Sequence, residues 1–240
     1  MPEPRRQQAN PSKKVPARRS GKRPPSKRQR RSPKRNVVAV ALAVAAAVIA
    51  IVVVTSRSGG HSGPAGPEGP PLEAGAPLGS GGAVPPGPSG TLGVQCGSTE
   101  VVATHFHIHL AVYVNGQPRS IPLGIGFVGQ LQVQPSAKGP FAAGTSDCLY
   151  WLHTHATDGI IHVEAPAGRI FDLQQFFGVW GQPLTDSGVG PATGNVTAFV
   201  NGKRWTDAID GIPLKRHESI QLDVGTPVVA PRAPVDFGNL

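Results

Sequence analysis

The sequence predicts a mainly β ectodomain, β-sandwich-like or α+β, with one short helix, preceded by a single transmembrane helix. Three observations lead to this fold class. Apolar and polar residues alternate through much of residues 93–225, Asn-Gly pairs interrupt the alternation twice, and residues 37–54 are all apolar. Alternation is typical of half-buried strands, whose successive side chains point to opposite faces. A long unbroken apolar run favours a helix in a bilayer.

Residues 1–36 form a basic N-terminal tail, which we expect to be disordered and cytoplasmic. The tail holds 14 of the 23 Lys and Arg residues and one acidic residue, Glu3. Large apolar residues are almost absent from it, so it cannot bury enough surface to fold alone. Residues 56–240 carry nine basic and thirteen acidic side chains, a net charge of −4. We therefore expect no nucleic-acid binding by the ectodomain, because a nucleic-acid-binding domain carries basic residues on its folded surface.

Residues 37–54 are predicted to be a transmembrane helix that crosses the lipid bilayer once. Their length of 18 residues is at the short end of what spans the hydrocarbon core, about 20 residues. Short basic flanks stay in the cytoplasm, so a cell-membrane protein with a cytoplasmic N-terminus and an extracytoplasmic C-terminal domain is expected. The alternative is a cleaved secretion signal, whose apolar region usually has only about 7–15 residues. The basic tail is expected to contact anionic lipid head groups.

Residues 55–92 are predicted to be a Gly/Pro-rich linker, and residues 226–240 a Pro-rich C-terminal tail. The linker includes three collagen-like triplets, which begin at Gly63. Three triplets are too few for a triple helix, so the composition favours a semi-stiff spacer. The ectodomain is expected to cover residues 93–225, an ordinary length for one domain.

The turn signals of the ectodomain predict two hairpins. Asn115-Gly116 follows residues 110–114, and Asn201-Gly202 follows residues 196–200. An Asn-Gly pair between two strands favours a type I′ turn. The two stretches also resemble each other in sequence, which fits either a duplicated hairpin or two hairpins that obey the same turn chemistry.

One helix and a last strand complete the prediction. Asp172 can cap a helix in which Leu173, Phe176, Phe177 and Trp180 form one apolar stripe. Residues at these spacings lie on the same helix face, and we expect that face to pack in the core. Residues 219–224 alternate again and predict a final strand.

Histidines gather in two of the predicted strands. His105, His107 and His109 alternate with apolar residues in the first strand, so they share one face. Neighbours on one strand face are roughly 6.5–7 Å apart, so His105 and His109 are too far apart to share one metal ion on a regular strand. One of the three is therefore expected to be spare, unless there are two sites or a bulge.

The second histidine cluster predicts a hairpin around residues 156–159. A four-residue loop would pair His153 with His162, and a two-residue turn at Asp158-Gly159 would pair His155 with His162. Both registers place His153, His155 and His162 on one face, where opposed Cβ atoms lie about 4.5–5.5 Å apart. His107 or His109 is expected to join them, with Glu164 or Asp158 orienting an imidazole.

Cys96 and Cys148 are predicted to form a disulfide bond. Both follow the transmembrane segment and lie in the part expected outside the cell, where disulfides persist. The bond would hold the two histidine strands side by side, since each cysteine precedes one of them. The competing interpretation, two thiolate metal ligands, needs cysteines closer to the histidines.

Two stretches of the ectodomain resemble a known family. They are Leu152-His-Thr-His-Ala-Thr-Asp-Gly-Ile-Ile-His-Val-Glu-Ala-Pro166 and Phe171-Asp-Leu-Gln-Gln-Phe-Phe-Gly-Val-Trp-Gly-Gln-Pro183. The resemblance is to uncharacterised membrane-anchored or secreted proteins of bacteria and archaea, and it covers roughly residues 93–225. It implies the domain boundaries and the importance of the histidines, and it implies no activity because the family has none established.

The leading functional hypothesis is an extracytoplasmic domain that binds a transition metal, zinc or copper, for metal handling or sensing. Imidazole is the commonest metal ligand in proteins, and imidazole sets suit both metals. The candidate ligands are His105, His107, His109, His153, His155 and His162. The alternatives are a zinc-dependent hydrolase or lyase, which needs an open metal position and a base such as Glu164 or Asp158, and an envelope interaction domain with structural histidines.

Overall fold

The computed structural model describes residues 64–240. The predicted basic tail, the predicted transmembrane helix and His61 lie outside the described residues. Within residues 64–240, no helix is both long and apolar enough to cross a membrane. This part of the chain is mainly β with one short helix, which confirms the fold class predicted for the ectodomain.

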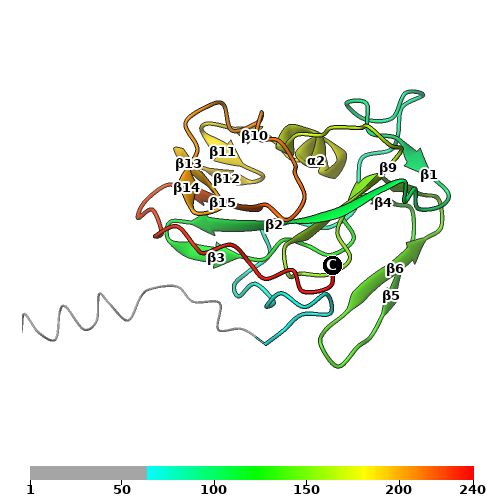
Figure 1. The fold of residues 1–240 in the computed structure, drawn as a ribbon, viewed down its shortest axis with the longest axis horizontal. Coiled ribbons are helices and arrows are strands. Elements are labelled where there is room, and N and C mark those ends of the chain that lie inside the picture. The colour runs from blue at the N-terminus through cyan, green and yellow to red at the C-terminus, as the bar shows by residue number, and fades with distance from the viewer. Residues whose placement is uncertain (1–63) are drawn as a thin grey trace, which may run out of the picture. The chain divides into compact units, whose positions relative to one another are not determined.

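The described part of the chain contains one long strand, β2, and several shorter ones (Figure 1). The strands are β1 (Cys96–Gly97), β2 (Thr104–Val114), β3 (Gln117–Arg119), β4 (Phe127–Val128), β5 (Leu131–Gln134), β6 (Phe141–Thr145), β7 (Cys148–Tyr150), β8 (Leu152–His153), β9 (Ile160–Ala165), β10 (Leu184–Thr185), β11 (Gly188–Val189), β12 (Ala192–Thr193), β13 (Val196–Val200), β14 (Lys203–Arg204) and β15 (Ser219–Val224), and the helix is α2 (Leu173–Trp180).

The largest sheet has the strand order β14-β13-β15-β2-β9-β8, and β3 pairs with β2 as a hairpin. Strand β15 runs parallel to β2, whereas the other pairs in this sheet are antiparallel. Smaller sheets are formed by β1-β7-β4, β10-β11-β12 and β5-β6. Strand β2 thus lies at the centre of the main sheet, between the C-terminal strand and β9.

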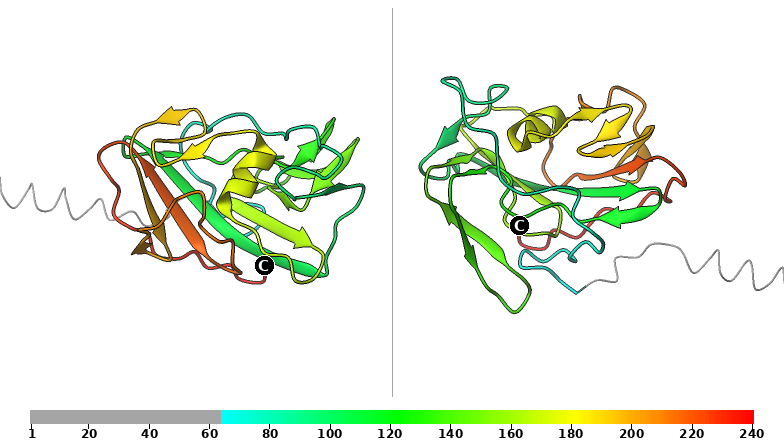
Figure 2. Two further views of the ribbon diagram at one scale, coloured as in Figure 1. Left: turned by 90° about the horizontal axis from the view of Figure 1, so that it is seen from above. Right: turned by 180° about the vertical axis from the view of Figure 1, so that it is seen from behind.

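Strand β2 has one apolar and one histidine-bearing face, as the alternation predicts. Ile108, Leu110 and Val112 are buried in the same core as Phe176 and Phe177 of α2. The helix and β10–β12 lie on this side of β2, while the segment from residue 64 (cyan) and the C-terminal end (red) lie on the other (Figures 1 and 2). The histidine face is therefore turned away from the helix.

The helix begins as the sequence predicts, and a glycine ends it. Asp172 is its N-cap: the carboxylate accepts the N–H of Gln175 at 2.9 Å, and the Gln175 side chain accepts the N–H of Asp172 at 3.0 Å. This reciprocal pair satisfies two N–H groups that the first helical turn leaves without partners. Gly181 ends the helix at φ 74°, a left-handed conformation that glycine adopts without strain.

Both predicted hairpin turns are confirmed. Asn115 and Gly116 have φ values of 51° and 73°, and Asn201 and Gly202 have values of 50° and 75°. Positive φ at both central residues is what a type I′ turn requires. The turns connect β2 with β3 and β13 with β14.

The disulfide between Cys96 and Cys148 is also confirmed. It joins β1 to β7, which pair antiparallel. The prediction that the strand of His105 lies beside the strand of His153 is wrong. Strand β9 lies between them, because β2 and β8 each pair with a different edge of β9.

The folded unit extends beyond residues 93–225 at both ends. In the segment assigned to the linker, Leu78 is only 3% exposed and belongs to the core, and the carbonyl of Ser80 accepts the indole N–H of Trp180. In the C-terminal tail, Arg232 forms a 2.8 Å ion pair with Glu73. We call residues 64–92 the proline-rich segment below.

Candidate metal centre

Three neighbouring strands bring the histidines together. His107 of β2 lies opposite His162 of β9, which in turn lies opposite His153 of β8. His105 lies opposite Glu164 in the next row of the same face. Directly opposed residues on one sheet face have Cβ atoms about 4.5–5.5 Å apart, so their side chains meet.

The structure selects one of the two hairpin registers that the sequence leaves open. His153 pairs with His162, as a four-residue loop at residues 156–159 predicts. His155 lies between β8 and this loop and turns its ring toward His153, with its Nε2 3.2 Å from Nε2 of His153. The register with a two-residue Asp158-Gly159 turn is wrong.

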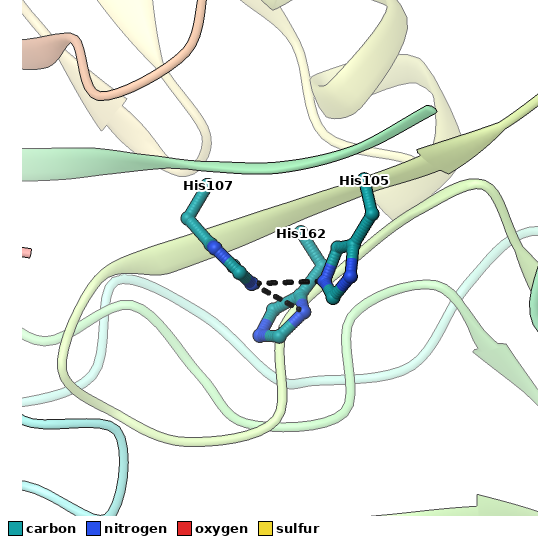
Figure 3. A group of neighbouring side chains, drawn as sticks. All are labelled: His105, His107 and His162. Atoms are coloured by element: carbon teal, nitrogen blue, oxygen red, sulfur yellow. Dashed lines mark hydrogen bonds between the residues drawn. The ribbon is translucent and has the colours of Figure 1, made fainter. Parts of the chain in front are cut away.

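The ring nitrogens form two groups that share His162. In the first group, Nε2 of His107 lies 3.1 Å from Nε2 of His105 and 3.2 Å from Nδ1 of His162 (Figure 3). The second group is His153, His155 and His162. Within each group, the potential ligand atoms all lie within 4.8 Å of one another, so each group could hold a metal ion.

The spacing of these nitrogens is that of ligands around a metal. Zinc binds histidine nitrogen at about 2.0–2.1 Å in tetrahedral geometry, which places two such nitrogens about 3.3 Å apart. The observed separations are 3.1 Å for His105–His107, 3.2 Å for His107–His162 and 3.2 Å for His153–His155. The side chains are therefore arranged around points that an ion of this size would fill.

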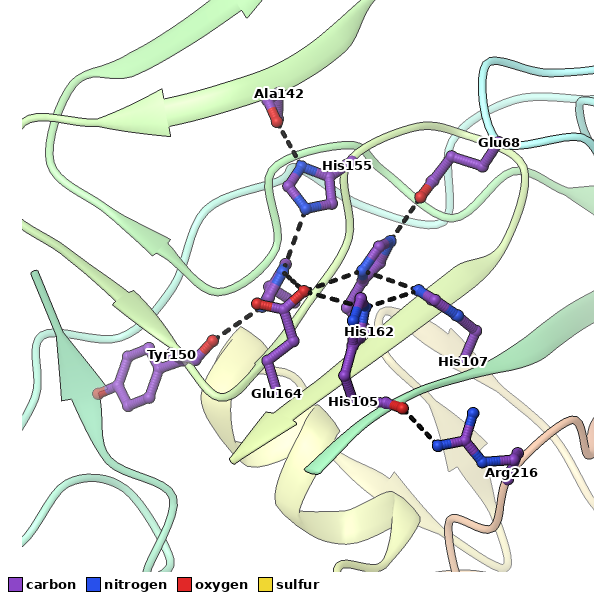
Figure 4. Close-up of polar contacts among 10 residues, drawn as sticks. Glu68, His105, His107, Ala142, Tyr150, His155, His162, Glu164 and Arg216 are labelled. Carbon is purple, nitrogen blue, oxygen red and sulfur yellow. Dashed lines mark hydrogen bonds and ion pairs between the residues drawn. The ribbon is translucent and has the colours of Figure 1, made fainter. Parts of the chain in front are cut away.

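The outer nitrogens of His153 and His155 fix which nitrogen carries the proton. Nδ1 of His153 lies 2.9 Å from the carbonyl oxygen of Tyr150, and Nδ1 of His155 lies 2.5 Å from that of Ala142 (Figure 4). A carbonyl oxygen only accepts, so each Nδ1 donates. In the neutral rings, each Nε2 then carries a lone pair, and the two lone pairs face each other.

His162 is oriented in the same way by a carboxylate from the proline-rich segment. Nε2 of His162 lies 2.5 Å from Oε1 of Glu68, so it donates to Glu68 (Figure 4). Nδ1 of His162 is then available to interact with His107 and with a metal ion bound in the cluster. A carboxylate that binds the outer nitrogen of a histidine is a recurrent support of metal ligands, because it fixes the ring and raises its basicity.

Glu164 lies inside the cluster rather than behind it. Its Oε1 is 3.3 Å from Nε2 of His105, 3.4 Å from Nδ1 of His162 and 3.9 Å from Nε2 of His153. The residue is only 3% exposed, and its Oε2 has no hydrogen-bond partner within the described part of the chain. A buried carboxylate oxygen without a partner is costly, which makes this atom a further candidate ligand.

Burial keeps most of the cluster uncharged. Burial, together with the neighbouring His162 and His105, lowers the pKa of His107 to about 3. Burial also lowers the pKa of His153 and of His155. These rings are therefore neutral at physiological pH, which is the form that binds a metal.

His162 behaves differently because two carboxylates adjoin it. Burial lowers its pKa, but hydrogen bonds and attraction from Glu164 and Glu68 outweigh this effect and raise the pKa to about 9. In the metal-free protein, the positive charge that balances these carboxylates is therefore a proton on His162. A metal ion bound to the cluster would replace this charge.

Two phenylalanine rings pack against the histidines on the β8 side of the cluster. The ring of Phe141 stacks on His155 with centroids 4.6 Å apart, and Phe127 contacts His153 and His155 edge-on at 5.6 and 5.5 Å. These rings pack against the imidazoles and hold them in place. His105 forms the opposite, more open side, with 42% of its side chain exposed.

Two predicted site residues lie away from the cluster. His109 places Nε2 3.3 Å from Oε1 of Glu73, which also pairs with Arg232. Asp158 is a buried residue of the loop and accepts the N–H of Ile160, and burial together with the charge of Glu68 raises its pKa to about 7. Within β2, His105 and His107 thus join the cluster and His109 does not.

Sequence reasoning missed Glu68 and Glu73. They are the only acidic residues in residues 55–92, and each contacts a histidine of the β2–β9 sheet face. Two isolated carboxylates in a Gly/Pro-rich stretch whose other charged residue is Arg57 are the signal that could have indicated this contact.

Comparisons with models of protein families, with curated proteins and with solved structures found no match to the chain. The function is therefore argued from the geometry of the cluster.

Proposed function

We propose that this protein is a membrane-anchored, extracytoplasmic domain that binds zinc or copper through its histidine cluster, for metal handling or sensing. The observation that carries the proposal is the facing pair of lone-pair nitrogens. Nε2 of His153 and Nε2 of His155 are 3.2 Å apart, and both rings already donate through Nδ1 to a carbonyl oxygen.

Two lone pairs at this distance repel each other unless a positive charge lies between or beside them. A proton is a poor candidate for this charge, because burial lowers the pKa of both rings. A metal cation satisfies both nitrogens at once and also balances the Glu164 carboxylate. A purely structural role of the histidines leaves only the protonated His162 beside the two rings to offset this repulsion.

The donor set favours Zn²⁺ or Cu²⁺. Imidazole and carboxylate suit these ions, whereas Cu⁺ prefers thiolate and thioether sulfur. Both cysteines are bonded to each other, and the single methionine of the chain is Met1. The cluster therefore offers nitrogen and oxygen but no sulfur.

The proposal includes a location at the cell membrane, with the metal-binding domain outside the cytoplasm. The apolar residues 37–54 and the basic tail before them support a cell-membrane anchor with the described domain outside. The disulfide supports an oxidising compartment, because such bonds are rare in the cytosol. Metal handling or sensing at the cell surface fits a buried cluster that is tied to a membrane anchor.

The second candidate is a zinc-dependent hydrolase or lyase, and one observation favours it. A cavity of about 670 Å³ is lined by Glu68, by Lys138 and by residues 234–240. Glu68 thus contacts both this cavity and His162. A metal with three protein ligands and an exchangeable water would support catalysis, whereas four protein ligands would support storage or sensing.

Metal titration of the full chain, purified in detergent and stripped with a chelator, tests the proposal. We expect calorimetry with Zn²⁺ and with Cu²⁺ to show binding that the double substitution His153→Ala, His155→Ala weakens by more than about 100-fold. The matched control is His217→Ala, because the His217 ring stacks on Phe237 and belongs to neither candidate ligand group. Circular dichroism checks that each variant is folded. Equal affinity in the wild type and the double variant would refute metal binding at this cluster.

A further inference from the structure

The cluster contains more donors than one metal ion uses. Five imidazoles and the Glu164 carboxylate converge there, whereas a structural zinc ion takes four ligands. The donors are also arranged in order across the sheet. Strand β2 supplies His105 and His107, β8 and the loop after it supply His153 and His155, and β9 places His162 and Glu164 between the two pairs.

We propose that the cluster holds two metal ions, bridged by Glu164. This inference rests on the proposed function and specifies its metal site. The first ion is bound by His105, His107, His162 and Oε1 of Glu164. The second ion is bound by His153 and His155 and by Oε2 of Glu164.

Four of the six separations within the first set of donors match the distance expected between zinc ligands. Nε2 of His107 is 3.1 Å from Nε2 of His105 and 3.2 Å from Nδ1 of His162, and Oε1 of Glu164 is 3.3 and 3.4 Å from the same two partners. Four edges between these four atoms thus lie near the roughly 3.3 Å expected for zinc ligands. Nδ1 of His162 is assigned to this ion because Nε2 is already bound by Glu68.

The second set of donors is incomplete, and Glu164 completes it. His153 and His155 face each other at 3.2 Å, on the far side of Glu164 from β2. Oε1 of Glu164 is 3.9 Å from His153, and Oε2 is buried with no hydrogen-bond partner among the described residues. Metal ions in two-metal sites lie about 3.5–4 Å apart, a separation that the two oxygens of one carboxylate bridge.

The two ions are expected to differ in chemistry. The first is closed by four protein donors, whereas the second has only three and keeps a position for water or a small anion. The exchangeable position would therefore lie at the β8 side, next to Phe127 and Phe141. Ligand exchange or reaction would occur at the second ion, and the first would fix the geometry of Glu164.

Stoichiometry separates this inference from the proposed function. The full chain in detergent is stripped, loaded with excess Zn²⁺ or Cu²⁺, desalted and analysed by inductively coupled plasma mass spectrometry. We expect two ions per chain in the wild type and in His217→Ala, and one ion in His105→Ala and in His155→Ala. One ion in the wild type overturns the dinuclear site but leaves the proposed function, whereas no bound ion overturns both.

Electron paramagnetic resonance of the Cu²⁺ form tests the bridge. Two Cu²⁺ ions joined by Glu164 are expected to couple, which abolishes or broadens the ordinary signal and adds a half-field transition. His105→Ala and His155→Ala are each expected to show the uncoupled signal of a single ion. His105 is partly exposed, so its substitution leaves the fold intact and keeps the comparison valid. Two uncoupled signals in the doubly loaded wild type would overturn the bridged arrangement.

Discussion

At the scale of single residues, Glu68 supports the cluster from a distant part of the sequence. It comes from the proline-rich segment, 94 residues before His162 in sequence, and its carboxylate accepts from Nε2 of that histidine. It thereby selects the nitrogen that His162 turns to the cluster. It also raises the pKa of His162, together with Glu164.

Substitution of Glu68 is expected to weaken metal binding in a graded way. Glu68→Gln keeps an oxygen that accepts from His162 but removes the charge, and Glu68→Ala removes both. Supporting carboxylates typically contribute about 10–100-fold to metal affinity, so we expect a loss in this range for Glu68→Ala and a smaller one for Glu68→Gln. Competition titration with a chromophoric chelator measures both values.

The matched control is Glu100→Ala, which removes an exposed carboxylate and is expected to bind metal as the wild type does. A Glu68→Ala variant with wild-type affinity would mean that Glu68 does not support a ligand.

The sequence predicts which histidines share a strand face, because the periodicity of a strand determines this. The shared face of His105, His107 and His109 follows from the two-residue repeat of a strand. The choice between His105 and His109 does not, because it depends on how β2 is aligned with β9. That alignment places His107 opposite His162 and leaves His109 opposite Ile160, beyond the reach of His153.

At the scale of elements, β2 carries the core on one face and the site on the other. Hairpins, the helix and its cap were predictable because each is determined by neighbours in sequence, such as Asn115-Gly116 or the Asp172–Gln175 pair. The strand order was not. The parallel pairing of β15 with β2 joins residues about a hundred positions apart, and no local pattern encodes it.

The two faces of β2 predict opposite results for two single substitutions. Ile108 is fully buried in the core, so Ile108→Asp places an unpaired carboxylate there at a cost of several kcal/mol, and we expect the domain to unfold. His105→Asn lies on the other face and at its open edge, so we expect it to fold normally and to bind one metal ion fewer than the wild type. Far-UV circular dichroism with thermal melting, alongside metal analysis, measures both. A cooperative melt of Ile108→Asp at the wild-type temperature would contradict the burial of this face.

At the scale of the whole molecule, the proline-rich segment belongs to the fold. Its composition predicts a spacer, because Gly and Pro carry no periodic apolar pattern. The structure shows contacts along its length: Glu68 reaches His162, Leu78 enters the core, and Val84 donates its N–H to the helix residue Val179. Single apolar residues in a Gly/Pro-rich stretch do not produce a recognisable pattern, so composition alone could not predict these contacts.

The C-terminal tail is bound to the same region. Arg232 pairs with Glu73 of the proline-rich segment, and Glu73 also lies against His109 of β2. Both ends of the described chain therefore cover the histidine face of the sheet. This cover explains why His107, His109 and His162 are buried even though the core lies on the other side of β2.

Two leucines of the proline-rich segment test whether it is a structural part of the domain. Leu78 is 3% exposed within the core, whereas Leu92 is 56% exposed. A buried leucine truncated to alanine typically costs about 2–5 kcal/mol, and an exposed one about 0.5 kcal/mol or less. In urea unfolding of the full chain, followed by tryptophan fluorescence, we therefore expect Leu78→Ala to shift the midpoint to clearly lower urea and Leu92→Ala to leave it nearly unchanged. If the segment were a spacer without packing, both variants would unfold at the wild-type midpoint. Because the same segment supplies Glu68, a large effect of Leu78→Ala would also mean that the metal site depends on residues that the sequence assigns to a linker.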